Sequence, residues 1–169
     1  MKFIHLSFSG IFLLLAGCAQ QEPGALGEVL RGTPHPGKVY RVKTTAYVGK
    51  RNAVGRSLQY GPVTSAAADW SEFPLGTRFR VLENKAEYIV DDYGSAMVGT
   101  RTIDLYMPHS RAMREWGTRT VDIEILEWGS PRASMEVLLP REGTRYVGKM
   151  LVSLRRQSQG MPKQFHKMD

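Results

Sequence analysis

The chain has a single cysteine, Cys18, and only four histidines among its 169 residues. One cysteine excludes an intrachain disulfide and a metal site built from several thiolates. Acidic residues are the minority among the charged ones, 16 against 23 Lys and Arg, which leaves a formal charge of +7. This excess suits an anionic partner such as nucleic acid, acidic lipid or an acidic cell-wall polymer. With 42% hydrophobic residues, the composition is that of one globular domain and excludes a collagen-like, coiled-coil or wholly disordered chain.

The first eighteen residues predict export. A basic start at Lys2, an apolar stretch over residues 3–15 and small residues after it are typical of a secretory signal peptide, here residues 1–17. The stretch is too short for a membrane-spanning helix, which needs about 20 apolar residues. Leu15-Ala16-Gly17-Cys18 resembles a bacterial lipobox, in which the cysteine is acylated and becomes the new N-terminus. The alternative is an ordinary signal peptide with an incidental Cys18.

We expect Cys18 to carry the lipid, because the only cysteine of the chain stands at the one position that requires it. Several acyl chains would hold the protein firmly at a membrane. Ala19 follows the cysteine, and by resemblance to lipoproteins of diderm bacteria this favours the outer membrane, facing the periplasm. The predicted location is therefore the cell envelope.

Residues 18–37 are rich in Gly, Pro, Gln and Glu and predict a flexible tether. Residues 38–130 contain short runs of alternating or small residues that predict strands over 38–48, 62–68, 78–82, 86–90, 102–107 and 120–126. In the last of these, Val121, Ile123 and Ile125 should face inward. A short helix is predicted from Ser110, as N-cap, to a stop at Gly117. Together these elements predict an all-β fold, a small six-stranded closed barrel with one short helix.

The remainder, residues 131–169, forms a basic C-terminal extension. Two apolar runs, 135–139 and 149–154, are interpreted as two further strands, and the polar residues after Arg155 as disordered. The extension is either simply solvated or in contact with anionic wall polymer or lipid headgroups.

Four aspartates stand at predicted strand ends or turns: Asp69, Asp91, Asp92 and Asp104. Strict alternation places Asp91 and Asp92 on opposite faces of their strand, so we expect them to serve different sites. Asp104 lies between two apolar residues that should point away from it. Since Asp is depleted in strands, its presence there needs a reason: a backbone hydrogen bond, a partner Arg, or acid/base chemistry.

The chain from Thr45 to Gly129 resembles the 3D domain, a family named for its three aspartates. The resemblance rests on these segments taken in order: Thr45-Ala46-Tyr47, Ala67-Ala68-Asp69, Phe73-Pro74-Leu75-Gly76-Thr77, Val90-Asp91-Asp92-Tyr93-Gly94-Ser95-Ala96, Gly99, Arg101, Ile103-Asp104-Leu105-Tyr106, Trp116-Gly117 and Val121-Asp122-Ile123-Glu124-Ile125-Leu126. It implies a double-psi β-barrel, as in membrane-bound lytic transglycosylase A, rare lipoprotein A and expansins. The spacing from Asp92 to Asp104 is one residue longer than is typical of the family.

The resemblance places the three family aspartates on Asp69, Asp92 and Asp104. It implies that Asp104 is the single catalytic acid and base of a peptidoglycan lytic transglycosylase, and Asp92 is the other predicted catalytic residue, acting through its like charge. The reaction cleaves the linkage between N-acetylmuramic acid and N-acetylglucosamine and leaves a 1,6-anhydro ring. Apolar neighbours and a like charge at Asp92 would both raise the pKa of Asp104.

Candidate substrate contacts surround these carboxylates. Trp70 and Tyr93 either stack on sugar rings or pack the barrel, and Tyr47 either hydrogen-bonds in the cleft or covers the core. Asp69 and Gly94 complete the predicted cleft. Arg101 either holds a substrate carboxylate or peptide stem, or forms an ion pair with a local Asp.

Two other functions stay open. The barrel could bind glycan without cleaving it, as expansin-like proteins do, or it could be a hydrolase in which Asp69 or Asp92 supplies a second acid. The histidines His35, His109 and His166 lack ligand spacing, so we expect no metal and no cofactor. Nucleic acid is an unfavoured partner because the chain is exported and lacks interleaved aromatic and basic residues. We expect a monomer that binds peptidoglycan strands and reaches the membrane through its lipid.

Overall fold

The computed structural model describes residues 36–160, within the compact unit Gly32–Asp169. The predicted signal peptide, Cys18 and almost all of the predicted tether lie outside the described residues, as do residues 161–169. These predictions therefore stay predictions.

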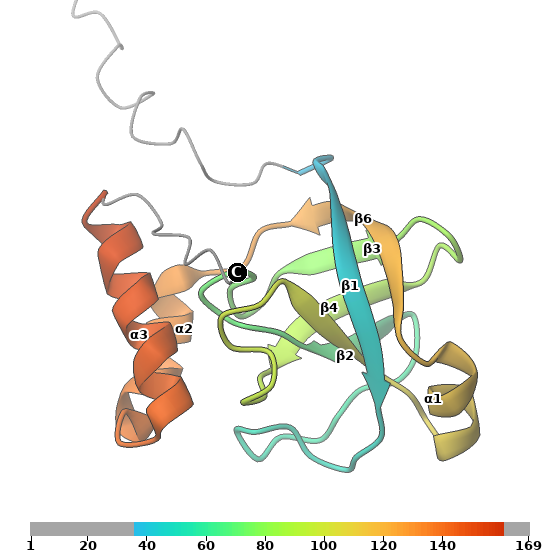
Figure 1. Cartoon of the computed structure of the whole chain (residues 1–169), viewed down its shortest axis with the longest axis horizontal. Coiled ribbons are helices and arrows are strands. Elements are labelled where there is room, and N and C mark those ends of the chain that lie inside the picture. The colour runs from blue at the N-terminus through green and yellow to red at the C-terminus, as the bar shows by residue number, and fades with distance from the viewer. Residues whose placement is uncertain (1–35, 161–169) are drawn as a thin grey trace, which may run out of the picture. The chain divides into compact units, whose positions relative to one another are not determined.

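Six strands close into a barrel (Figure 1). They are β1 (Val39–Tyr47), β2 (Val63–Ala67), β3 (Arg78–Val81), β4 (Glu87–Asp92), β5 (Thr102–Tyr106) and β6 (Arg119–Glu127), in the order β1-β5-β2-β4-β3-β6. The pairs β1–β5 and β2–β4 are parallel, and the other four are antiparallel. All six predicted strands are confirmed, and so are the predicted all-β barrel and its double-psi class.

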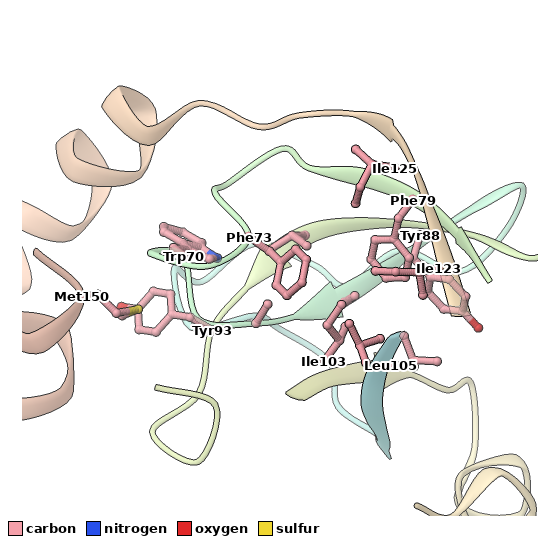
Figure 2. Close-up of a cluster of buried hydrophobic side chains, with 14 of the residues drawn as sticks. Trp70, Phe73, Phe79, Tyr88, Tyr93, Ile103, Leu105, Ile123, Ile125 and Met150 are labelled. Carbon is pink, nitrogen blue, oxygen red and sulfur yellow. The ribbon is translucent and has the colours of Figure 1, made fainter. Parts of the chain in front are cut away.

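The barrel interior is filled by one face of each strand, as the alternation predicts. Val121, Ile123 and Ile125 of β6 are buried as expected, and Ile103 and Leu105 of β5 are fully buried. On the neighbouring strands β3 and β4, the rings of the paired residues Phe79 and Tyr88 stack with their centroids 5.5 Å apart (Figure 2). Burying each such side chain stabilises the fold by about 1.5–3 kcal/mol.

Helix α1 (Ser110–Trp116) is confirmed, with one correction at its start. The N-cap is His109, not Ser110, because His109 Nδ1 accepts a hydrogen bond from the Ala112 amide at 3.1 Å. Gly117 ends the helix as predicted, at φ 64°, a value that favours glycine.

The C-terminal extension is helical, so the two strands predicted there are wrong. It forms α2 (Pro131–Leu138), the 3-10 turn η1 (Leu139–Arg141) and α3 (Arg145–Ser158). Ser130 caps α2, and a proline in its first turn favours helix. In α3 the buried residues Val147, Met150, Leu151 and Leu154 follow helical spacing, which a short apolar run does not reveal. The helix also continues past Arg155, to Ser158.

The two helices lie side by side next to the barrel (Figure 1) and hold the segment that precedes β3. The Ser130 amide donates to the Leu75 carbonyl at 2.9 Å, and the Leu75 amide donates to Ser134 Oγ at 2.9 Å. Gly129 sits so close that a Cβ there would overlap the carbonyl oxygens of Pro74 and Leu75. The extension therefore fixes the loop that carries Asp69 and Trp70 into the barrel.

Among residues 36–160, no helix has both the length and the apolar character needed to cross a membrane.

Candidate functional site

Three neighbouring strands bring the acidic side chains together on the outer wall of the barrel. Ala67 of β2 pairs with Asp104 of β5 on one side and with Asp92 of β4 on the other. On the far side of β5, Thr45 of β1 pairs with Asp104. Asp104 points outward because its neighbours Ile103 and Leu105 are fully buried inside. The small Ala67 thus separates two carboxyl groups by two strand spacings, about 10 Å at the backbone.

Asp104 has one carboxyl oxygen that accepts no hydrogen bond from the described residues and is not buried. Its Oδ1 accepts a hydrogen bond from Thr45 Oγ1 at 2.7 Å. Its Oδ2 accepts none from the described residues, and it is not among the buried oxygens that lack a partner. Burial raises the pKa of Asp104 and the charge of Asp92 raises it further, while the Thr45 hydrogen bond opposes both. Asp104 can therefore hold a proton at a higher pH than an ordinary aspartate.

Both carboxyl oxygens of Asp92 accept hydrogen bonds from other groups of the protein. Its Oδ1 accepts from the amides of Ala53 and Tyr93 at 2.7 and 2.8 Å, and its Oδ2 accepts from the Tyr47 hydroxyl at 3.0 Å. The residue is buried. It supplies a fixed carboxylate near Asp104, with both oxygens occupied.

Asp91 lies on the same wall, contrary to the prediction from alternation. The β2–β4 register passes from Ala66 opposite Val90 to Ala67 opposite Asp92, so Asp91 is an extra residue in β4. This bulge returns Asp92 to the outer face, which Asp91 already occupies. Asp91 Oδ2 accepts from Ser65 Oγ at 2.8 Å, whereas its Oδ1 is buried and has no donor among the described residues. Burial raises the pKa of this carboxyl group.

Asp69 connects the loop after β2 with the turn before β5 through hydrogen bonds. Its Oδ1 accepts from the amide and the hydroxyl of Ser71, and its Oδ2 accepts from the Gly99 amide at 2.7 Å. Only 2% of the residue is exposed, and burial raises the pKa of its carboxyl group. Gly99 has φ +81°, so the turn that Asp69 holds favours glycine at this point. The predicted contact of Asp69 with substrate is not supported, because no face of it reaches solvent.

Two of the predicted aromatic contacts, Trp70 and Tyr93, are buried inside the protein. Trp70 is fully buried and Tyr93 is 5% exposed, and their rings meet edge to face with centroids 4.9 Å apart. Figure 2 shows both beside Met150 of α3. The structure selects the packing alternative for these two residues.

Tyr47 is half-buried and donates to Asp92, as the cleft alternative predicted. Its ring meets that of Tyr106 edge-on, at 5.8 Å between centroids. Tyr106 belongs to the motif Ile103-Asp104-Leu105-Tyr106 but is not among the predicted site residues. Its position opposite Tyr47 in the β1–β5 register adds an aromatic side chain to the wall beside Asp104.

The other two predicted contacts are peripheral. Arg101 pairs with Glu72, its Nε lying 3.4 Å from Glu72 Oε2, so the ion pair is found but its partner is a glutamate and not the predicted aspartate. Gly94 opens the turn before β5, where its carbonyl accepts from the Met97 amide at 3.0 Å. Neither approaches Asp104 through a hydrogen bond.

Sequence reasoning missed the loop between β1 and β2. Asn52 Nδ2 donates to the Asp91 carbonyl at 2.9 Å, and the Ala53 amide donates to Asp92. Ser65 was also missed as the partner of Asp91. These contacts join residues that are 26 or 39 positions apart, and no local spacing signals them. As for metal, residues 36–160 contain no group of three or more His, Cys, Asp or Glu side chains arranged to hold an ion.

Comparison with known proteins points to one domain family. The family model described as "3D domain" matches residues 64–127, which include Asp69, Asp92 and Asp104. The chain is also 34% identical over 105 residues to a Bacillus subtilis (strain 168) protein named "Putative cell wall shaping protein YabE". The match covers 58% of this chain and 25% of that protein, so the chain spans about a quarter of the relative's length.

Proposed function

We propose that this chain, whose barrel contains a 3D domain, acts on peptidoglycan as a lytic transglycosylase. The cell-wall role in the name of the Bacillus subtilis relative supports the substrate class. The observation that carries the activity is the contrast among the carboxyl groups. Asp69 and Asp92 have both oxygens bonded within the protein, and Asp104 has one left open.

A single carboxyl group is enough for this reaction. Protonated Asp104 donates its proton to the glycosidic oxygen, and the bond from that oxygen to C1 of N-acetylmuramic acid breaks. The resulting carboxylate then takes the proton of the C6 hydroxyl, whose oxygen forms a new bond to C1. The products are a free 4-hydroxyl on N-acetylglucosamine and a 1,6-anhydro ring. No water is consumed, because the nucleophile belongs to the same sugar.

The surroundings of Asp104 suit both steps. Its raised pKa keeps the acid form available, and Thr45 orients one oxygen so that Oδ2 is the one presented. The charge of Asp92 contributes to that raised pKa, and the Tyr47 hydroxyl holds Asp92 in place. Asp92, Tyr47 and Thr45 are therefore positioning residues, and Asp104 is the catalytic one.

The proposed location is the cell envelope. The domain family and the relative support this, and the predicted lipobox at Cys18 narrows it to a lipoprotein of the outer membrane that faces the periplasm.

A second candidate is glycan binding without cleavage. Asp69, Asp91 and Asp92 all hold backbone or side-chain groups of the protein, so much of the acidic pattern serves the fold. A barrel of this kind could hold glycan without turnover. A hydrolase is not proposed, since it needs a second carboxylate to activate water, and within the described residues neither Asp69 nor Asp92 has a free oxygen.

The test uses the full chain in detergent with purified sacculi, and mass spectrometry of the released muropeptides. We expect anhydromuramyl products from the wild type and none from Asp104→Asn, which keeps the shape of the side chain. Asp122→Asn, an exposed aspartate on β6, is the matched control and should act as wild type. Products with reducing ends would indicate hydrolysis. Absence of release, with both proteins sedimenting with the sacculi, would favour the binding function.

A further inference from the structure

The outer face of β1 carries a cation next to the acidic site. Residues two apart on a strand share a face, so Lys43, Thr45 and Tyr47 form one row. In the β1–β5 register Thr45 pairs with Asp104, and Lys43 pairs with Thr102. We propose that Lys43 is an anion-binding subsite that takes a carboxylate carried by the glycan held at Asp104. This rests on the proposed function for its substrate class.

The register fixes the distance. Lys43 and Asp104 lie one strand apart and two residues along, which separates their Cα atoms by about 8 Å. A lysine side chain extends about 6 Å from its Cα. The ammonium group can therefore reach a substituent of a sugar bound at Asp104, and the two side chains can contact the same ligand from two sides.

The charge of Lys43 is not used elsewhere in the described structure. The residue is exposed and forms no ion pair with any residue from 36 to 160. Its cross-strand neighbours are both uncharged, Thr102 on β5 and Thr120 on β6. By contrast, Arg80 is held between Glu87 and Glu124, and Arg41, two residues along β1, faces Asp122.

The negative charge beside Asp104 explains why a cation at Lys43 would favour binding of an anionic ligand. Asp91 and Asp92 lie on the same outer face as Asp104, and the negative charge of Asp92 repels an anionic ligand. Peptidoglycan strands carry carboxylates on the stem peptides of their muramic residues. A cation at Lys43 offsets the repulsion on one side of Asp104 and orients the muramic residue toward it. The subsite thus selects a carboxylate-bearing glycan over a neutral one.

The test measures binding in the Asp104→Asn background, so that no turnover occurs. The probes are soluble peptidoglycan strands and the same strands with their carboxylates converted to amides. We expect Lys43→Gln to weaken binding of the carboxylate probe about two- to fivefold at low salt and to leave binding of the amidated probe unchanged. Lys43→Arg should keep the affinity. Arg41→Gln, which removes the same charge from the same strand, should change it less.

Three outcomes would overturn the proposal: unchanged binding in Lys43→Gln, equal weakening for both probes, or equal weakening in Arg41→Gln. Failure of the parent protein to bind either probe would overturn it as well. Circular dichroism confirms that each variant is folded. The cleavage assay on Asp104 is separate, so a binding-only barrel could still confirm Lys43, and an active enzyme could still lack the subsite.

Discussion

At the scale of the residue, the aspartates differ in the number of hydrogen bonds that their carboxyl groups accept. Asp92 receives three hydrogen bonds and Asp69 also receives three. Asp104 receives one, from Thr45. Hydrogen bonds to a carboxylate favour its charged form, whereas burial favours the neutral form. The balance leaves Asp104 with a raised pKa and an open oxygen, the two properties that a general acid needs.

Thr45 therefore offers a pH test of the proposed mechanism. Its hydrogen bond lowers the pKa of Asp104, so Thr45→Val should raise that pKa beyond its already raised value. Activity requires the protonated form at the start of the reaction and is lost as the pH rises through this pKa. We expect the high-pH limb of the profile of kcat/KM to move to higher pH in Thr45→Val.

Thr45→Ser keeps the hydroxyl and serves as the control, with a limb close to that of the wild type. A limb that stays in place in Thr45→Val, or moves to lower pH, would show that Asp104 is not the group that titrates.

At the scale of the element, a bulge and a turn position the site. The extra residue in β4 turns Asp91 and Asp92 to one wall, and the loop before β3 is fixed by α2 through Ser130 and Ser134. The contact between that loop and the start of the extension is tight enough that only glycine fits at residue 129. The extension is thus part of the support of the site.

Gly129→Ala tests this support. The added Cβ would overlap the carbonyl oxygens of Pro74 and Leu75, so the loop must shift and its hydrogen bonds must weaken. We expect the free energy of unfolding to fall by about 1–3 kcal/mol, the usual cost of overpacking. Urea denaturation measures it. Gly143→Ala is the control, because nothing lies within 4 Å of the added carbon and the substitution should change stability little. Equal stability of the two variants would contradict the role given to this contact.

At the scale of the whole molecule, the sequence correctly predicts those parts of the fold that follow from alternating apolar residues and from turn residues. Six strands, the inward face of β6 and the stop at Gly117 follow from local pattern. Two features that the sequence predicts wrongly or leaves open depend on long-range packing. The bulge at Asp91 exists only in the pairing with β2, and Trp70 is buried because α3 and Tyr93 cover it. The sequence of residues 135–139 and 149–154 predicts strands wrongly, because apolar runs of five or six residues do not distinguish strand from helix.

The barrel and the extension share one core, so they should unfold together. Met150 of α3 is fully buried, and Figure 2 shows it beside Tyr93 and close to Trp70. Tyr146 of the same helix packs on Tyr93, with ring centroids 6.2 Å apart. Met150→Ala leaves a cavity between the helix and the barrel, and we expect a loss of about 2–5 kcal/mol in the free energy of unfolding.

The loss should appear in a single transition, with coincident curves for helix content by far-ultraviolet circular dichroism and for the packing of the three tryptophans by fluorescence. Val152→Ala, on the exposed face of the same helix, should cost little because that side chain is 46% exposed. If the helical signal were lost at lower urea than the fluorescence change, the extension would be a separate unit. The loop that carries Asp69 would then have to be held by the barrel alone. A single transition would instead show that the helices support the outer face that carries Asp91, Asp92 and Asp104. The connection runs through the loop at Asp69, which is joined to the turn at Gly99, just before β5, by a hydrogen bond of 2.7 Å.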